Sequence, residues 1–349
     1  NIALIESISE FKDNKSIDRV TLMAILEDVF RNALKKKFGT DENFDIIINP
    51  DKGDMEIWRR RIIVADDDLD LEHFEIELSE ARKIEPDFEI GEEVTEEFKL
   101  IDLGRRAILA LRQNLISKIH EHDKTNLYKQ FKDLIGELYT AEVHHVRPRV
   151  VILMDDEGNE IVLPKEKQIP SDFFRKGDHV RGIIENVELK GNKPQIIMSR
   201  TSEKFLEKLF EQEIPEVFDG LITVKKVVRI PGDKAKVAVD SYDDRIDPVG
   251  ACVGMKGSRI HGIVRELGNE NIDVINYTTN TQLYITRALA PAKISSVKID
   301  EERKKADVYL KLEEVSKAIG RGGQNIKLAG LLTGFDIDVI REGIEEEID

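Results

Sequence analysis

Two pairs of glycines, each three residues apart, are the strongest chemical feature of this 349-residue sequence. The first lies in Gly-Met-Lys-Gly at 254–257 and the second in Gly-Arg-Gly-Gly at 320–323. A turn without Cβ atoms lets a sugar-phosphate backbone approach the loop amides and the N-terminus of the next helix. We therefore interpret each loop as a clamp for about four nucleotides of single-stranded RNA.

Both glycine loops fall at the same point of an internal repeat. Residues 253–260 align with residues 319–326 at an offset of 66, and Gly268 aligns with Gly334. Each copy is predicted to run helix, strand, strand, helix, glycine loop, helix, strand. A lone pair of this kind arises by chance about once or twice in a chain with 22 glycines, so the shared position carries the weight. The two copies have almost no spacer and should pack as one unit.

The residues expected to contact RNA belong to the loops and to the start of the helices that follow them. Lys256 and Arg321 occupy the variable loop positions, where a cation would meet phosphate, although an exposed charge at a turn can equally be solvated. The alternative for each loop is a tight helix hairpin with glycines at its caps. The expected RNA-binding residues are Gly254, Met255, Lys256, Gly257, Ser258, Arg259, Gly320, Arg321, Gly322, Gly323, Gln324, Asn325 and Lys327.

Upstream of the repeat, five short β-rich runs with turn residues between them predict a small closed barrel of the OB type. The runs cover residues 139–145, 149–154, 160–163, 180–187 and 195–199. Such barrels bind single strands with stacking aromatics and a basic groove. We favour Phe173 and Phe174 as core residues instead. The barrel residues considered for RNA contact are Phe173, Phe174, His179, Arg181, Arg147, Arg149, Tyr139, His144 and His145.

The first 130 residues are predicted to form an α/β head with a helical connector. An amphipathic helix over 17–38 would be capped by Ser16 and end at Gly39. Three strands and two helical pieces would follow, with a turn at 49–53 between the first two strands. The strands are expected at 44–48, 55–64 and 74–78, and the helical pieces at 103–122 and 128–135. Basic clusters at 35–37, 59–61 and 105–106 are either surface charge or a local RNA or partner face.

The net charge of −16 would by itself argue against nucleic acid, but the acidity is unevenly distributed. Residues 66–97 hold 15 acidic and 2 basic residues, and residues 131–340 are close to neutral. No apolar run approaches the length of a membrane span, and no secretory signal is recognisable. The single cysteine, Cys252, excludes a disulfide framework, is interpreted as a packing residue and favours a reducing cytoplasm.

Catalytic and cofactor sites are not expected. The chain has no Gly-Lys dipeptide and hence no Walker A loop. His120 and His122 diverge on a helix, while His144 and His145 should point to opposite faces of a strand. The aspartates at 66–70 could hold Mg²⁺, but a solvated acidic turn is favoured. We predict no enzyme activity, no metal and no cofactor.

The repeated strings resemble those of a known family. Residues 245–257 with Arg259 and Ile260 are similar to the first KH signature of the NusA family of bacterial transcription termination/antitermination factors, and residues 318–329 to the second. The head is similar at 33–37 and 104–107. This resemblance implies an α+β multidomain chain: a head and connector at 1–130, an OB-fold barrel of ribosomal S-one type at 131–200, and tandem type II KH domains at 201–278 and 279–349.

The resemblance also implies a function. It indicates a non-enzymatic, monomeric elongation factor that binds RNA polymerase through its head and nascent single-stranded RNA through its other domains, with other Nus-type factors as further partners. Pausing, termination and antitermination would be its targets. The chain shows no C-terminal acidic repeats, so autoinhibition through them is not assumed. The alternatives are a ribosome-assembly or translation protein, or an RNA-processing enzyme, whose catalytic domains an acidic head of about 130 residues is too small to supply.

Overall fold

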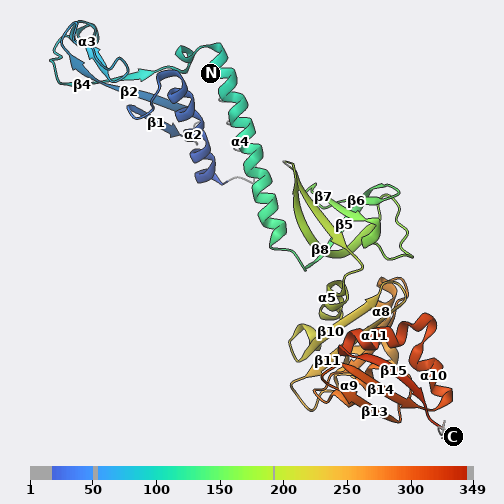
Figure 1. Cartoon of the computed structure of the whole chain (residues 1–349). Helices are drawn as coiled ribbons and strands as arrows, with labels where there is room; N and C mark the ends of the chain where they lie inside the picture. Colours follow the sequence, from blue (N-terminus) through green and yellow to red (C-terminus); the bar gives the residue numbers. More distant parts are fainter. Residues whose placement is uncertain (1–17, 50–53, 192, 344–349) are drawn as a thin grey trace. The chain divides into compact units, whose positions relative to one another are not determined.

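A computed structural model describes residues 18–49, 54–191 and 193–343 (Figure 1). The chain divides into two compact units after Leu127. In the first unit, α2 and α4 cover one face of a small sheet in which β2 pairs with β1, β3 and β4. Phe30, Leu34, Phe44 and Leu115 are fully buried between the helices and the sheet. The elements are α2 (Arg19–Phe38), β1 (Phe44–Asn49), β2 (Asp54–Val64), β3 (Glu75–Glu77), α3 (Leu78–Ile84), β4 (Glu93–Phe98), η1 (Leu100–Leu103) and α4 (Arg105–Lys132).

The head differs from its prediction in three places. Helix α2 is capped by Asp18, whose Oδ1 accepts from the backbone N–H of Thr21 at 2.7 Å; Ser16 and residues 50–53 of the expected turn lie outside the described residues. Helix α3 and strand β4 were not expected. The two predicted helical pieces form one helix, α4, because the polar stretch between them contains neither glycine nor proline.

The second unit begins with the barrel, whose five strands close in the order β5-β6-β7-β9-β8. The closing pair, β7 with β9, is parallel, and the other neighbours are antiparallel. This is the predicted five-stranded barrel, seen in green in Figure 1. Its strands are β5 (Leu138–Val146), β6 (Val150–Met154), β7 (Glu160–Pro164), β8 (His179–Lys190) and β9 (Lys193–Ser199).

The two repeat copies have the same topology. In each, the first two strands are antiparallel and the third pairs in parallel with the second, which is the arrangement expected of type II KH domains. The first copy is made of α5 (Glu203–Glu213), α6 (Pro215–Phe218), β10 (Ile222–Ile230), β11 (Lys234–Ser241), α7 (Pro248–Val253), η3 (Met255–Gly257), α8 (Ser258–Glu266) and β12 (Asn271–Asn276). The second is made of α9 (Thr281–Ala288), β13 (Ser296–Asp300), β14 (Lys305–Leu310), α10 (Leu312–Ile319), η4 (Arg321–Gly323), α11 (Gln324–Thr333) and β15 (Asp336–Arg341).

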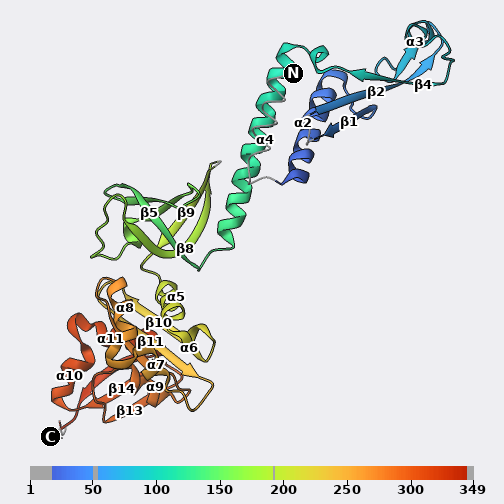
Figure 2. The same cartoon turned by 180° about the vertical axis from the view of Figure 1, so that it is seen from behind.

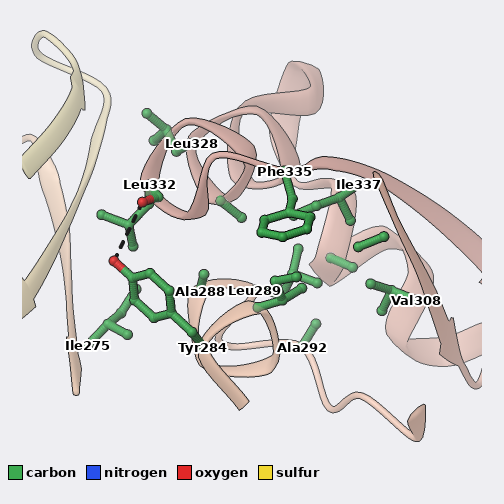
Figure 3. Close-up of a cluster of buried hydrophobic side chains, with 14 of the residues drawn as sticks. Ile275, Tyr284, Ala288, Leu289, Ala292, Val308, Leu328, Leu332, Phe335 and Ile337 are labelled. Atoms are coloured by element: carbon green, nitrogen blue, oxygen red, sulfur yellow. Dashed lines mark hydrogen bonds between the residues drawn. The ribbon is translucent and has the colours of Figure 1, made fainter. Parts of the chain in front are cut away.

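The two copies share one hydrophobic core. Val228, Ala238 and Ile275 of the first sheet are buried in the same cluster as the helices and sheet of the second copy. Figure 3 shows Ile275 in this cluster beside Tyr284. The ammonium group of Lys236, also fully buried, donates to Asp273 at 2.8 Å and to the carbonyl of Ala290 at 3.1 Å. Burial lowers the pKa of Lys236, and the Asp273 carboxylate opposes that shift. The copies therefore pack as one unit, as expected.

Two buried arginines join the barrel to the first copy. The Arg200 guanidinium pairs with Asp172 of the barrel at 2.8 Å and with Glu266 of α8 at 3.2 Å. Arg229 of β10 forms a fully buried pair with Glu270 and donates to the carbonyl of Arg200 at 2.9 Å. A charge that is taken out of water must be paired and hydrogen-bonded, and both arginines are. This joint was not predicted from the sequence.

Candidate nucleic-acid interface

The two glycine loops have the same backbone geometry. Gly254 ends α7 with φ 76° and ψ 174°, and Gly320 ends α10 with φ 74° and ψ 174°. One 3-10 turn follows in each copy, and Gly257 and Gly323 then precede α8 and α11 with φ 75° and 74°. All four glycines have positive φ, which L-residues rarely adopt. Both loops therefore require glycine where the sequence has it.

Each loop also lies tightly against the helix that follows. A Cβ atom on Gly254 would lie 2.8 Å from Cγ of Arg259, and one on Gly320 would lie 2.6 Å from Cβ of Asn325. By contrast, a Cβ atom on Gly322 or Gly323 would meet nothing within 4 Å. The first glycine of each pair therefore serves close packing, and the second loop has open space at its tip. Figure 2 labels α7 and α8, the two helices that frame the first loop.

Arg259 and Asn325, which are equivalent in the repeat, each connect the helix after a loop to the helix before it by a hydrogen bond. Nη1 of Arg259 donates to the carbonyl of Ala251 at 2.9 Å, and Nδ2 of Asn325 donates to the equivalent carbonyl of Lys317 at 3.2 Å. Asn325 is fully buried and also donates to the carbonyls of Leu289 and Ala318. This burial contradicts the expected contact of the Asn325 side chain with RNA.

The other expected residues divide by accessibility. Arg259 also pairs with Glu216 at 2.6 Å, and Gln324 donates to Asp233 of the first copy at 3.3 Å, so both side chains already have protein partners. Among the described residues, the exposed cations Lys256, Arg321 and Lys327 have no ion-pair partner. Ser258 and Gly322 are exposed, and Met255 is 86% exposed at the tip of the first loop. The structure thus places three free cations and an apolar side chain at the two loops.

A groove of about 540 Å³ lies along α11, the helix that follows the second loop. Helix α11 forms one wall and the start of β15 forms the other. Its lining is mostly apolar, with Lys327 as its cation, and it suits the faces of unstacked bases better than phosphates. Gly330 lets the walls approach, since a Cβ atom there would lie 3.0 Å from the carbonyl oxygen of Phe335. The lining residues are Ile326, Lys327, Gly330, Leu331, Gly334, Phe335, Asp336 and Ile337.

This groove was missed in the sequence, apart from Lys327. Its side chains are ordinary apolar residues, and the repeat marks Ile326 and Gly334 without indicating a groove. Lys226 of the first copy was missed as well; its Nζ donates to the carbonyl of Leu331 at 2.7 Å.

The barrel residues considered for RNA contact are dispersed. The prediction that Phe173 lies in the core is wrong, because its side chain is 77% exposed; Phe174 is half-buried against the guanidinium of Arg200. The Tyr139 hydroxyl donates to Asp155 at 2.7 Å, and burial raises its pKa. Arg181 donates to Gln212 at 2.8 Å. Arg147, Arg149 and His179 are exposed, and Arg147 borders a different groove of about 490 Å³ on the barrel wall.

His144 and His145 do not point to opposite faces as expected. A β-bulge shifts the register of β5 between Val143 and His145, and the two imidazole rings lie 4.4 Å apart between centroids. A bulge inserts an extra residue and so breaks the alternation of side chains along a strand.

Asp66, one of the aspartates considered for Mg²⁺, accepts from the backbone N–H of Ser79 at 3.0 Å. Within the described ranges, no three histidine, cysteine or acidic side chains are grouped to hold a metal ion.

Two further features of the sequence, Cys252 and the basic cluster at 59–61, are explained by burial and by contacts within the protein. Cys252 is fully buried, and burial raises the pKa of its thiol to about 12. The Arg59 guanidinium lies 4.8 Å from the centroid of Phe38, while Arg60 pairs with Asp45 and Arg61 with Glu96. The cluster at 59–61 is therefore used by contacts within the head.

None of the helices that the structure describes is long and apolar enough to cross a bilayer.

Comparison with protein-family models identifies three segments. Residues 3–125 match the NusA N-terminal domain, residues 200–277 the NusA-like first KH domain, and residues 281–347 the NusA-like second KH domain. The chain is 34% identical to the transcription termination/antitermination protein NusA of Thermus thermophilus, over 94% of this chain and 90% of the relative. The chain belongs to the NusA family.

Two further NusA proteins are identical to this chain to a similar extent. That of Halalkalibacterium halodurans is 32% identical over 100% of this chain and 90% of its own length, and that of Bacillus subtilis is 31% identical over 99% and 92%. These alignments extend through the barrel, which lies between the segments matched by the NusA domain models. Both glycine loops lie inside the KH matches, so the candidate interface belongs to the NusA-family part of the chain.

Proposed function

We propose that this chain is a non-enzymatic transcription elongation factor that binds RNA polymerase and nascent single-stranded RNA and modulates pausing, termination and antitermination. Membership of a family whose relatives bear the name transcription termination/antitermination protein supports this role. The proposed division of labour assigns polymerase to the head and connector, 1–130, and RNA to the barrel, 131–200, and the KH domains, 201–278 and 279–349. The protein would act as a cytoplasmic monomer with other Nus-type factors.

The observation that carries RNA binding is the identical geometry of the two glycine loops together with their unpaired cations. Lys256 and Arg321 stand at the loop tips, Lys327 stands in the helix after the second loop, and the apolar groove along that helix can take bases. Phosphate contacts position a strand, and base contacts in the groove provide selection. The residues proposed to contact RNA are Gly254, Met255, Lys256, Gly257, Ser258, Gly320, Arg321, Gly322, Gly323 and Lys327, with Arg259 and Gln324 acting through their backbone and their remaining exposed surface.

Charge reversal at the loop tips tests this proposal. The double variant Lys256→Glu, Arg321→Glu places anions where phosphates would lie, so we expect its affinity for an unstructured RNA to fall at least tenfold. The neutral variant Lys256→Gln, Arg321→Gln should fall less, and its slope of log K against log salt should be shallower by about 1.4, from two lost contacts at about 0.7 each.

The readout is fluorescence anisotropy at several salt concentrations. As a matched control, Arg303→Glu reverses an exposed charge in the β13–β14 turn and should leave RNA binding unchanged. Parental affinity in the folded charge-reversal variant would contradict the proposed site.

A further inference from the structure

The loop that leads into β8, residues 172–179, presents an isolated aromatic ring beside cations. Phe173 is 77% exposed, and the guanidinium of Arg175 lies 5.6 Å from its ring centroid. Lys176 is exposed next to it. An exposed ring with a cation beside it is the arrangement on which single-stranded nucleic acids stack their bases, because every base has a π face and every nucleotide carries an anion.

Local hydrogen bonds and an ion pair hold the backbone of this loop. The Asp172 carboxylate accepts from the backbone N–H of Ile169 at 2.9 Å and pairs with Arg200. Asp178 closes the far side by accepting from the backbone N–H of Arg175 at 2.7 Å. Phe174 packs against the Arg200 guanidinium. Binding to a preformed loop costs less ordering entropy than binding to a mobile one, so even a single stacked base can contribute to affinity.

The same loop lies directly against the first KH copy. A Cβ atom on Gly268, in the turn between α8 and β12, would lie 2.3 Å from Oγ of Ser171. Phe173 is two residues further, at most about 7 Å of chain away. Helix α8 ends at this turn and begins at the first glycine loop, and its nine residues span about 13 Å. A strand held at the first loop is therefore within a few nucleotides of the Phe173 ring.

The surroundings of Phe173 favour a nucleobase over a protein partner. The described part of the 172–179 loop contains no other exposed large apolar residue. A stable protein interface buries about 800 Å² on each partner around an apolar centre, which one ring beside an arginine does not offer. One ring is sufficient for one base.

We propose that Phe173 stacks a nucleobase of the RNA strand that is bound at the first KH copy, with Arg175 and Lys176 at the adjoining phosphates. This inference rests on the proposed function. It names a binding residue outside both KH domains and so gives the proposed RNA contact of the barrel a defined place.

The test compares RNA lengths with the full chain. The probes are an unstructured 8-mer, enough for two clamps of about four nucleotides, and two 16-mers that extend it at the 5′ or the 3′ end. We expect one 16-mer to bind the parent more tightly than the 8-mer does. Phe173→Ala should weaken that 16-mer by about 5- to 150-fold and leave the 8-mer unchanged, since a stacked base contributes this much.

Three variants separate stacking from other causes. Phe173→Leu keeps an apolar side chain without a π face and should lose as much as alanine, whereas Phe173→Trp should retain binding. Tyr242→Ala removes an equally exposed ring (82%) in the first KH copy and should change nothing. In a Trp58→Phe background, the Phe173→Trp protein has a single tryptophan. Its emission should be quenched by the 16-mer that binds more tightly and not by the 8-mer.

Each failure has a distinct meaning. If neither 16-mer gains affinity over the 8-mer, or if Phe173→Ala binds both 16-mers like the parent, the stacking site is refuted while KH binding stands. Retained binding by Phe173→Leu would refute stacking in favour of a simple apolar contact. A loss confined to polymerase binding would make the loop a protein interface. If the variant Lys256→Glu, Arg321→Glu binds the 8-mer normally, the proposed KH function itself fails, whatever Phe173 does.

Discussion

Arg259 and Asn325 show how two different side chains perform one structural task. Both stand at the second position of the helix after a glycine loop, and each donates to the equivalent carbonyl of the helix before its loop. An arginine does this from a partly exposed position with Glu216 as a second partner, and an asparagine does it from full burial. The position therefore requires a side-chain donor that reaches the preceding helix, and it does not require a positive charge.

Removing the donor at this position should destabilise the second KH copy. Asn325→Ala leaves three carbonyls, two of them in buried hydrogen bonds, without their shared donor, so we expect the free energy of unfolding to fall by about 1–3 kcal/mol. Lys327→Ala, two residues further and exposed, should change it by less than about 0.5 kcal/mol while weakening RNA binding. Urea denaturation and anisotropy measure the two effects. Equal stability of both variants would show that the asparagine does not fasten the loop.

Side-chain direction was the least predictable property at this scale. Spacing located both loops, and glycine type explains their backbone, because positive φ is a local demand. Whether a polar residue after the loop points to solvent or under the loop depends on carbonyls contributed by distant segments, such as that of Leu289. Phe173 was misassigned for the same reason. Two adjacent phenylalanines between strands favour a core assignment, and only the conformation of the loop shows which of them is exposed.

At the scale of the element, the two glycines of the second loop should respond differently to substitution. Gly320 has φ 74° and ψ 174°, a region open essentially to glycine alone, and its Cβ would clash with Asn325. Gly322 has φ 61° and ψ 21°, the left-handed helical region, and the equivalent position 256 already holds a lysine at φ 54°.

We therefore expect Gly322→Ala to cost about 1 kcal/mol and Gly320→Ala at least about 1 kcal/mol more. Thermal unfolding of the full chain provides the comparison, with Gly158→Ala, a barrel-turn glycine at φ 80° with open space, as the reference for strain alone. A ranking in which Gly322→Ala is the more damaging would overturn the packing argument.

Elements with strong periodicity were predictable and short or interrupted ones were not. The five barrel strands and both KH copies follow their alternation and their turn residues closely. Helix α3 and strand β4 lie in the acidic stretch, where few apolar residues mark a face. No glycine in β5 marks the position of its bulge in the sequence. Because the bulge brings the imidazoles of His144 and His145 together, their contact could be seen only in the structure.

At the scale of the whole molecule, the uneven charge matches the proposed division between polymerase and RNA. Acidic residues are concentrated at 66–97, which repels RNA and suits a basic protein surface. The remainder is close to neutral in net charge and should therefore bind RNA weakly by itself. Attachment to the head would raise its effective concentration beside the transcript.

Cutting the chain between Gln130 and Phe131 should separate the two activities. Phe131 is fully buried, with its ring 5.5 Å from that of Tyr139, so it should stay with the barrel. Fragment 1–130 should bind polymerase, and fragment 131–349 should bind RNA. The intact chain should affect pausing at a lower concentration than the two fragments mixed, as measured by a pause-lifetime assay. A mixture as potent as the intact protein would remove the need for a tether.

The shared core of the KH copies has a consequence for the transcripts that this protein can select. Because Lys236, Gln324 and the common apolar cluster leave the second loop no freedom to move toward or away from the first, the distance between the two clamps is constant. An RNA with surplus nucleotides between its two bound tracts can loop them out, at an entropic cost that grows only logarithmically with their number. An RNA with too few cannot reach. Tract spacing in cognate transcripts should accordingly show a sharp lower limit and a gradual upper one.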